Sequence, residues 1–382
     1  MEEKKKLMRT ATIAASIGGL LKGQLKYMSQ YYSVSAVAST TDDTLEKVGK
    51  REGIAVFPLA MARSISIVQD LKSVWNLYRL FKRERPHIVH SMTPKAGLLT
   101  MMAAYFAGVP HRLHTFTGLI FPTKTGAMQK LLIVMDRVLC FCATRVYPEG
   151  QGVKKDLEKF KITSKTLKVI ANGNVNGIDL DFFDASRYNA DEKQELKQKL
   201  DIKDSDFVFL FAGRIVRDKG INELVGAFKK LLETNSNAIL LVLGDYEREL
   251  DPILPETEAV IVNHDNVICT GWQDDVRPFF AISDCMVLPS YREGFPNTVI
   301  QAGAMKLPSI VTDISGCNEI IIEGRNGTLV PVKNATVLHQ KMKEMIDKTV
   351  IYDPEECYEL IASRYKQDFV WEKLLEEYRS LD

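Results

Sequence analysis

The stretch "FVFLFAGRIVRDKGINELVGAF", residues 207–228, reads as a strand, a loop and a helix in direct succession. An apolar run ends at Ala212, Gly213 turns the chain, and Lys219 and Gly220 stand before an amphipathic helical pattern. Continuous apolar strands of this kind are typical of parallel sheets that helices cover on both faces. The stretch therefore predicts an α/β fold with a doubly wound parallel sheet.

The same alternation of strand and helix patterns extends in both directions, from "HIVHS" and "HRLHTF" upstream to "AILLVLG" and "CMVLPS" downstream. It pauses in the charge-rich segment 175–206. We therefore predict two doubly wound, Rossmann-like domains that face each other across a cleft, with ligands beyond the carboxyl ends of the strands. The predicted parts are an N-terminal domain at 1–178, a linker at 179–203, a C-terminal domain at 204–364, and a helix at 365–382 that returns to the N-terminal domain.

Composition narrows the class of protein. The chain has 382 residues, 46% of them apolar, which fits two domains of ordinary size. Its 50 basic and 49 acidic residues give a net charge of +1, which argues against nucleic acid as a partner. Six scattered cysteines show no zinc spacing, and a chain of this length does not need disulfides, so we expect a reduced, cytosolic compartment.

The first residues, "MEEKKKLMRTATIAASIGGLL", also resemble a weak secretory signal. We interpret residues 10–16 instead as the first buried strand, followed by Gly18 and Gly19 and then a helix. No run of about 18 apolar residues occurs, so we expect no membrane span.

Two cations stand where the first-quoted strand gives way to its helix. Arg214 and Lys219 are five positions apart in a loop at the predicted carboxyl edge of the sheet, an arrangement that suits a diphosphate. A pair of solvated surface charges is the alternative interpretation.

A second stretch, "YREGFPNTVIQAGAMKLPSIVTD" at 291–313, adds a helix start after another strand. Pro296 fits the first turn of that helix, and the free backbone N–H groups there favour an anionic group. Glu293 would be repelled by phosphate, so we expect it to meet a sugar hydroxyl. Gln301 lies eight positions later and can reach the same cleft. A helix cap beside an ordinary exposed glutamine would explain the pattern equally simply.

"GRIVRDKG", "TGWQDD" and "PSYREGFPNTVIQAGAMKLPSIVTD" resemble retaining glycosyltransferases of family four, which have the GT-B fold. "RPHIVHSMTPKAGLLTMMAAYFAGVP" and "NGNVNGIDLDFF" resemble the same family, and the motifs occur in the expected order over nearly the whole chain. The resemblance implies a bacterial enzyme of capsule, O-antigen or lipid-linked glycan synthesis. It further implies a nucleotide diphosphate sugar as donor, with UDP-sugars the expected class, a glycan acceptor and no cofactor.

The resemblance also assigns roles to residues. Arg214 and Lys219 would hold the diphosphate, and Glu293 would contact the donor sugar. Gln301 replaces the family's ribose-binding glutamate, which removes a charge-assisted hydrogen bond but keeps an acceptor and two donors. The backbone near Gly271 and Trp272 would meet the base, and the backbone of Gly294, Phe295, Pro296 and Asn297 would bind the sugar and the phosphate.

In the N-terminal domain, Gly18 and Gly19 resemble the family's glycine turn, although a plain turn is an equal alternative. Thr117 occupies the place of a family histidine. His114 stands three residues earlier, an offset that points it to the opposite face of a strand, and we weigh it both as a catalytic group and as a structural histidine. Lys95 is a candidate contact for an acceptor phosphate.

The resemblance also implies that the donor sugar keeps its anomeric configuration. In this mechanism the leaving diphosphate oxygen would take the proton of the acceptor hydroxyl. Asp179 and Asp181 match a metal motif of a different glycosyltransferase fold, but we interpret them as structural and predict no metal. The cationic side chains and the helix start near Asn297 would stabilise the leaving charge.

Two amphipathic segments, residues 70–85 and 123–145, combine aromatic, apolar and basic side chains. They could lie on the cytoplasmic face of the inner membrane, or simply pack on the first sheet. A sugar-nucleotide epimerase and a non-catalytic nucleotide-sugar binder remain the alternative functions, and products formed from the donor alone would distinguish the epimerase.

Overall fold

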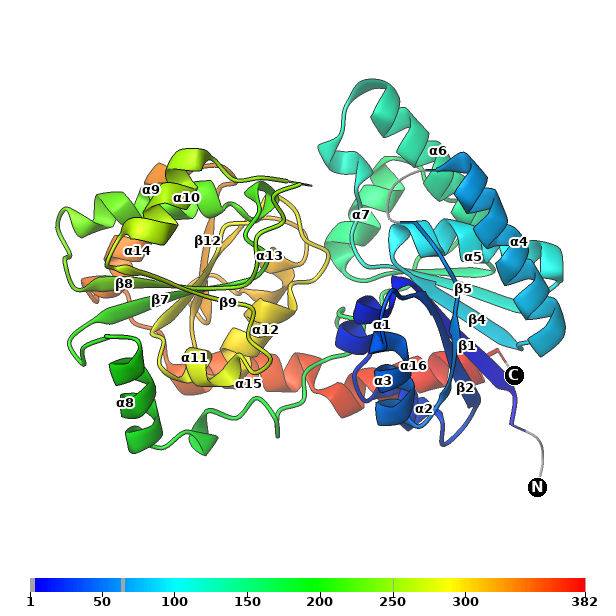
Figure 1. Ribbon diagram of the computed structural model, residues 1–382, viewed down its shortest axis with the longest axis horizontal. Coiled ribbons are helices and arrows are strands. Elements are labelled where there is room, and N and C mark those ends of the chain that lie inside the picture. Colours follow the sequence, from blue (N-terminus) through cyan, green and yellow to red (C-terminus); the bar gives the residue numbers. More distant parts are fainter. Residues whose placement is uncertain (1–3, 63–65, 250, 382) are drawn as a thin grey trace. The chain divides into compact units, whose positions relative to one another are not determined.

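The computed structural model describes residues 4–62, 66–249 and 251–381, and the chain divides into two compact units (Figure 1). Unit 1 extends to Gly177 and resumes at Gln367, and unit 2 comprises Ile178–Lys366. Each unit contains one six-stranded sheet in which every neighbouring pair of strands is parallel. The predicted α/β class, with two doubly wound sheets, is confirmed.

The sheet of unit 1 has the order β3-β2-β1-β4-β5-β6, which is the doubly wound order of dinucleotide-binding domains. Its strands are β1 (Lys6–Ile13), β2 (Ser33–Ser39), β3 (Ala55–Pro58), β4 (Ile88–Met92), β5 (His111–Phe116) and β6 (Arg145–Pro148). Its helices are α1 (Ala14–Leu20), α2 (Gln24–Met28), α3 (Thr44–Glu52), α4 (Ile67–Glu84), α5 (Pro94–Ala107), η1 (Phe121–Thr123), α6 (Gly126–Cys142), α7 (Gln151–Lys159) and α16 (Gln367–Arg379).

The sheet of unit 2 has the order β12-β11-β10-β7-β8-β9, so β7 stands between β8 and β10. Its strands are β7 (Phe207–Ala212), β8 (Ala238–Leu243), β9 (Val267–Gly271), β10 (Cys285–Leu288), β11 (Ser309–Thr312) and β12 (Gly327–Val330). Its helices are η2 (Ala185–Arg187), α8 (Ala190–Lys199), η3 (Arg217–Lys219), α9 (Ile221–Leu232), α10 (Pro255–Asn263), α11 (Arg277–Ala281), α12 (Asn297–Ala304), α13 (Cys317–Ile320), α14 (Ala335–Ile346) and α15 (Pro354–Tyr365).

Central strands such as β7 and β8 are buried on both faces, which explains why they are apolar throughout rather than alternating. In unit 1, the core on one face lies beneath α4, α5 and α6, and the core on the other includes residues of α1, α2, α3 and α16. In unit 2, α10 and α14 both pack against α9, while α12 packs with α13 and α15. The segment predicted as a linker belongs to unit 2 and contains α8, whose first turn is closed by a capping box between Asn189 and Glu192.

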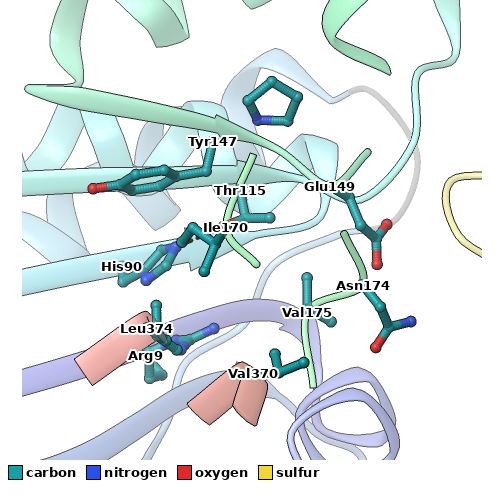
Figure 2. A pocket seen from close by; sticks show the side chains of 11 residues that line it. Arg9, His90, Thr115, Tyr147, Glu149, Ile170, Asn174, Val175, Val370 and Leu374 are labelled. Carbon is teal, nitrogen blue, oxygen red and sulfur yellow. Dashed lines mark hydrogen bonds between the residues drawn. The ribbon is translucent and has the colours of Figure 1, made fainter. Parts of the chain in front are cut away.

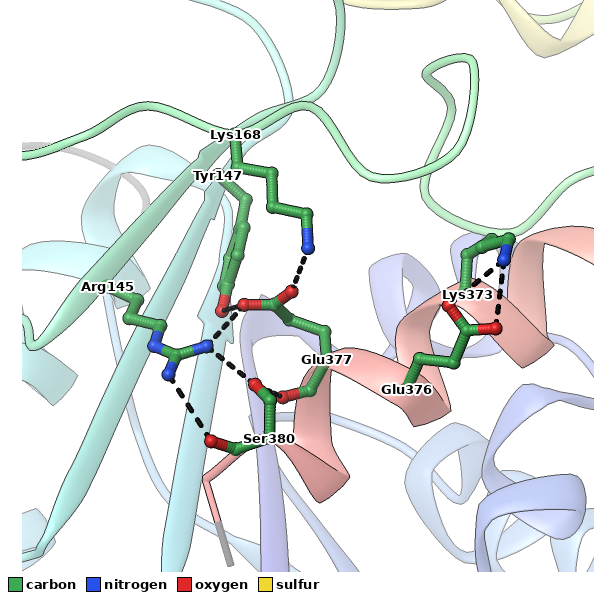
Figure 3. Close-up of polar contacts among 7 residues, drawn as sticks. All are labelled: Arg145, Tyr147, Lys168, Lys373, Glu376, Glu377 and Ser380. Atoms are coloured by element: carbon green, nitrogen blue, oxygen red, sulfur yellow. Dashed lines mark hydrogen bonds and ion pairs between the residues drawn. The ribbon is translucent and has the colours of Figure 1, made fainter.

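The C-terminal helix α16 is fixed to unit 1 by a buried carboxylate (Figure 3). Glu377, which is 5% exposed, accepts hydrogen bonds from Tyr147 and Arg145 of β6 and forms an ion pair with Lys168. Burial raises the pKa of Glu377, but these three partners outweigh it and leave the pKa lowered overall. The carboxylate is therefore held in its charged form, and this links the last helix to the edge strand of the sheet.

Candidate functional site

Two glycines bring the loops of unit 2 into contact at the carboxyl ends of its strands. A Cβ atom on Gly220, where φ is 71°, would lie 2.0 Å from the carbonyl oxygen of Pro289. A Cβ atom on Gly244, where φ is 135°, would lie 2.0 Å from the carbonyl oxygen of Gly213. Only glycine fits at either position, and so the loops after β7, β8 and β10 can approach one another closely.

The loop after β7 carries the two predicted diphosphate-binding cations, and each is paired with a carboxylate. The Lys219 ammonium donates a hydrogen bond to Glu293 Oε1 at 2.5 Å, from the loop after β7 to the loop after β10. Arg214 forms an ion pair with Glu247, which lies in the loop after β8. The side chain of Lys219 is 19% exposed and that of Arg214 is 56% exposed, so the arginine is the more accessible cation.

Glu293 is held in place from a second direction. Ser290 Oγ donates a hydrogen bond of 2.6 Å to the same carboxylate oxygen that Lys219 contacts. The carbonyl oxygen of Ser290 in turn accepts a hydrogen bond of 2.5 Å from Thr312 Oγ1, at the end of β11. A carboxylate that is positioned in this way beside a cation can accept hydrogen bonds from the hydroxyl groups of a sugar.

The segment after Glu293 forms the start of α12, with one difference from the prediction. The helix begins at Asn297, and Pro296 is its N-cap residue rather than part of the first turn. The ring of Phe295 is buried against Tyr365, with 5.4 Å between the ring centroids, so it packs in the core of unit 2. The side chain of Phe295 is therefore not available to a ligand, whereas Asn297 at the start of the helix is partly exposed.

The residues predicted near the nucleotide base and ribose lie at the same edge of the sheet. Gly271 ends β9 with φ at 68°, and the adjoining Trp272 is 70% exposed. The backbone N–H of Trp272 donates a hydrogen bond of 3.1 Å to Asp245 Oδ1, in the loop after β8. Gln301 lies within α12 and is partly exposed.

In unit 1, a small cavity lies between the sheet and α16 (Figure 2). Its volume is about 20 Å³, room for about one or two water molecules and too small for a nucleotide. The lining includes Arg9 and His90, both buried, and His90 Nε2 shares a hydrogen bond of 2.7 Å with Thr115 Oγ1. Both Arg9 and His90 Nδ1 also bond to the hydroxyl group of Tyr378 on α16. This network attaches the last helix to the sheet.

His114 is wholly buried, and the expectation of a catalytic role is not supported by its position. It lies on β5, on the opposite side from Thr115, and its Nδ1 shares a hydrogen bond of 2.8 Å with Ser91 Oγ. The space beside its ring is filled, because a Cβ atom on Gly97 would lie 2.4 Å from His114 Cε1. Burial lowers its pKa to about 3. These contacts favour the alternative of a structural histidine.

The other predicted residues of unit 1 are placed as follows. Gly18 and Gly19 lie within α1, so the predicted glycine turn is wrong: the strand ends at Ile13, and the helix follows at once. Lys95, near the start of α5, forms an ion pair of 2.7 Å with Asp70 of α4. Thr117 lies in the loop directly after β5, where it is partly exposed.

Asp179 is part of a turn, in which its carboxylate accepts a hydrogen bond of 2.9 Å from the backbone N–H of Phe182. Throughout residues 4–62, 66–249 and 251–381, no three His, Cys, Asp or Glu side chains are grouped as metal ligands would be.

Comparison with known proteins decides the family. Residues 192–365 match the family model described as glycosyl transferases group 1, and residues 26–173 match that of the glycosyl transferase 4-like domain. The chain belongs to glycosyltransferase family four.

Among curated proteins, this glycosyltransferase is similar to the capsular polysaccharide biosynthesis glycosyltransferase CapM of Staphylococcus aureus. The two are 28% identical over 98% of this chain and 97% of the relative. It is 27% identical to an Escherichia coli UDP-Gal:alpha-D-GlcNAc-diphosphoundecaprenol alpha-1,3-galactosyltransferase, over 78% of this chain and 76% of that enzyme. Among solved structures, Anabaena HepE in complex with UDP and glucose matches with a TM-score of 0.81 at 16% identity, over 98% of this chain and all of that one (100%). The glycosyltransferase thus has the GT-B fold.

Three residues at this edge of the glycosyltransferase were not among those predicted from the sequence: Asp245, Glu247 and Ser290. Asp245 contacts Trp272 and Glu247 contacts Arg214, each from a neighbouring loop, and Ser290 contacts Glu293 within the same loop. The signal for the first two was the pattern "LVLGDYE", in which a glycine ends an apolar strand just as Gly213 does after β7.

Proposed function

We propose that this glycosyltransferase transfers a sugar, with retention of configuration and without a metal ion, from a UDP-sugar to a hydroxyl group of a lipid-linked glycan in bacterial surface polysaccharide synthesis. The observation that carries the proposal is the convergence of Arg214, Lys219 and Glu293 at one edge of the unit 2 sheet. In open α/β sheets, ligands bind beyond the carboxyl ends of the strands, which is where these three residues lie.

In the proposed reaction, the acceptor hydroxyl attacks the anomeric carbon on the same face of the sugar from which the leaving group departs. The bond between that carbon and the diphosphate oxygen breaks, and the diphosphate takes the electron pair and then the acceptor's proton. Negative charge grows on the diphosphate as the bond breaks. Arg214, Lys219 and backbone N–H groups at the start of α12 would stabilise this charge more strongly than they stabilise the bound donor.

The donor and acceptor classes are supported by the relatives. The Escherichia coli relative acts, by its name, with UDP-Gal on an acceptor linked to diphosphoundecaprenol. A Campylobacter jejuni relative, 25% identical over 72% of this chain, is an N-acetylgalactosaminyltransferase that acts on a diphospho-undecaprenol-linked sugar. With a lipid-linked acceptor, the reaction would take place at a membrane surface.

The outer faces of α4 and α6 provide a surface for peripheral contact with the inner membrane. Each helix buries one face against its own unit and exposes another, so packing on unit 1 leaves a face that could meet a membrane. Phe141 is 70% exposed and Trp75 is 59% exposed, where a soluble surface would ordinarily be polar. The exposed apolar residues are Ile67, Val68, Leu71 and Trp75 on α4, and Met128, Leu131, Val134, Val138 and Phe141 on α6.

Exposed basic residues accompany these apolar side chains, and they suit a bilayer with anionic lipids. They are Lys72, Arg79 and Lys82 on α4, and Lys130 and Arg137 on α6. Within the described parts of the chain, no helix has the length and hydropathy to cross a bilayer.

The proposed function is tested by incubating the enzyme with a panel of UDP-sugars, with and without diphosphoundecaprenol-linked acceptors, and by analysing products by mass spectrometry and NMR. One added hexose on the lipid-linked glycan, with the donor's anomeric configuration, is the expected product. A new nucleotide sugar formed without acceptor would identify an epimerase. Binding of a nucleotide sugar without turnover on any acceptor would identify a binding protein.

A further inference from the structure

Every charged residue between Arg214 and Lys219 is bonded to one of the two neighbouring loops. Arg214 forms an ion pair with Glu247. Asp251 lies 3.3 Å from Arg217, measured from Oδ1 to Nε, and accepts a hydrogen bond from the backbone N–H of Asp218. These contacts reach the loop after β8. On the other side, Asp218 pairs with Arg292 and Lys219 with Glu293, both in the loop after β10.

The two cations proposed to hold the diphosphate are therefore already balanced by two carboxylates, Glu247 and Glu293. Of these, Glu293 has a proposed role toward the donor sugar, whereas Glu247 has none. Its side chain is 26% exposed and contacts the more accessible cation, whose side chain is 56% exposed. A ligand phosphate at Arg214 would thus meet a carboxylate that competes for the same guanidinium group.

The substrate and the product of the proposed reaction differ in charge at this point. In a nucleotide diphosphate sugar the outer phosphate is a diester with a single negative charge. In the free nucleoside diphosphate it is a terminal phosphate with a second pKa of about 6, so it is close to doubly charged at neutral pH. Repulsion from a fixed carboxylate therefore grows when the sugar leaves.

We infer that Glu247 is a specificity residue that acts as the internal counterion of Arg214 and favours release of the nucleoside diphosphate product over release of the donor. The inference rests on the proposed function, because it requires a diphosphate at Arg214. Glu247 acts through the arginine and through charge repulsion, without contact with the reacting atoms.

The test measures the dissociation constants of UDP, GDP, UDP-galactose and GDP-mannose by isothermal titration at pH 7.5, for the full chain and for Glu247→Gln. Removing the competing carboxylate should tighten binding of the free nucleoside diphosphate roughly two- to fivefold, as expected for an exposed ion pair. The matching nucleotide sugar should tighten by less than about twofold, because it carries less charge. Raising the salt concentration should reduce the difference.

Glu249→Gln is the matched control, since Glu249 lies two residues away in the same loop, is exposed and loses the same charge. Equal effects of the two substitutions, or equal tightening of both ligand types, would overturn the inference. A second check combines Glu247→Gln with Arg214→Gln: the effect of the glutamate should vanish when its arginine is absent, and an undiminished effect would also overturn it. If the wild-type protein binds none of the four ligands, the proposed function is contradicted, and the inference with it.

Discussion

The ammonium group of Lys219 and the carboxylate of Glu293 lie 2.5 Å apart, although 74 positions separate the two residues in sequence. They meet because β7 and β10 are neighbours in the sheet, so that their following loops leave the same edge. One residue of the pair is proposed to bind diphosphate and the other a sugar. The donor would therefore bridge two groups that are in contact before it arrives.

Replacing Glu293 with glutamine tests the sugar side of this pair. The amide keeps the size of the side chain and an acceptor for Ser290, but it loses the charged acceptor offered to a sugar hydroxyl. We expect kcat to fall by roughly 10²-fold, on the scale of other preorganised hydrogen bonds, while UDP binds as tightly as before or more tightly. Steady-state kinetics with titration of UDP separates the two effects. A change confined to KM would contradict this role.

The membrane surface is tested by the double substitution Val134→Ser and Phe141→Ser on α6. Because two apolar side chains would no longer enter the lipid interface, we expect binding to vesicles rich in phosphatidylglycerol to weaken by at least about tenfold. Val262→Ser is the control, since that valine of unit 2 is 67% exposed on α10. Co-sedimentation gives the measurement, and equal binding by both variants would argue against this surface.

Two buried histidines should make the protein less stable as the pH falls. Burial, the main cause in both cases, lowers the pKa of His90 well below its usual value and lowers the pKa of His114 to about 3. The unfolded chain takes up protons near pH 6.5 that the folded chain does not, so the free energy of unfolding decreases below that pH. By pH 5 the loss is about 2 kcal/mol for His114. Urea unfolding at pH 7.5 and pH 5 measures this loss, and His114→Gln should make the free energy of unfolding less dependent on pH. An unchanged pH dependence in that variant would contradict the prediction.

The attachment of α16 depends on the charge of Glu377. Glu377→Gln leaves Arg145 and Lys168 without their carboxylate, and we expect a loss of about 1–2 kcal/mol of unfolding free energy. Glu376→Gln is the control, because that glutamate is 54% exposed and pairs with Lys373 only on its own helix (Figure 3). Because the pKa of Glu377 is lowered, its contribution should persist above about pH 4.5 and disappear as the pH falls further. Equal stability of the two variants would contradict this account.

The fold could be predicted from the sequence because buried parallel strands such as β7 and β8 are apolar, and runs rich in apolar residues alternate with helical patterns along the chain. Strand ends are harder to predict. In the run "TATIAAS", no polar residue or turn signal marks the boundary between Ile13, where β1 ends, and Ala14, where α1 begins. The sequence therefore places the turn later, at Gly18 and Gly19. The predicted opposite orientation of His114 and Thr117 follows from alternation along a strand, but the burial of His114 depends on α5 covering that face.

The cations of the site could be predicted because they follow a strand directly in sequence. Their pairing with carboxylates could not. Glu247 is 33 positions from Arg214 and Glu293 is 74 positions from Lys219, and only the order of strands in the sheet determines which loops meet. A glycine after an apolar strand indicates that a loop reaches the ligand edge, but it does not specify which side chain will turn toward a neighbouring loop.

The rate of sugar transfer in excess EDTA, compared among the wild-type enzyme, Arg214→Gln and Lys219→Gln, tests the central claim most directly. The claim is that the leaving diphosphate is stabilised by these cations and by backbone N–H groups in place of a divalent ion. We predict that EDTA leaves the wild-type rate unchanged and that each substitution lowers it by roughly 10²–10³-fold. Arg217→Gln, in the same loop and 62% exposed, should retain the wild-type rate. Loss of wild-type turnover in EDTA, or full activity of either variant, would contradict the claim.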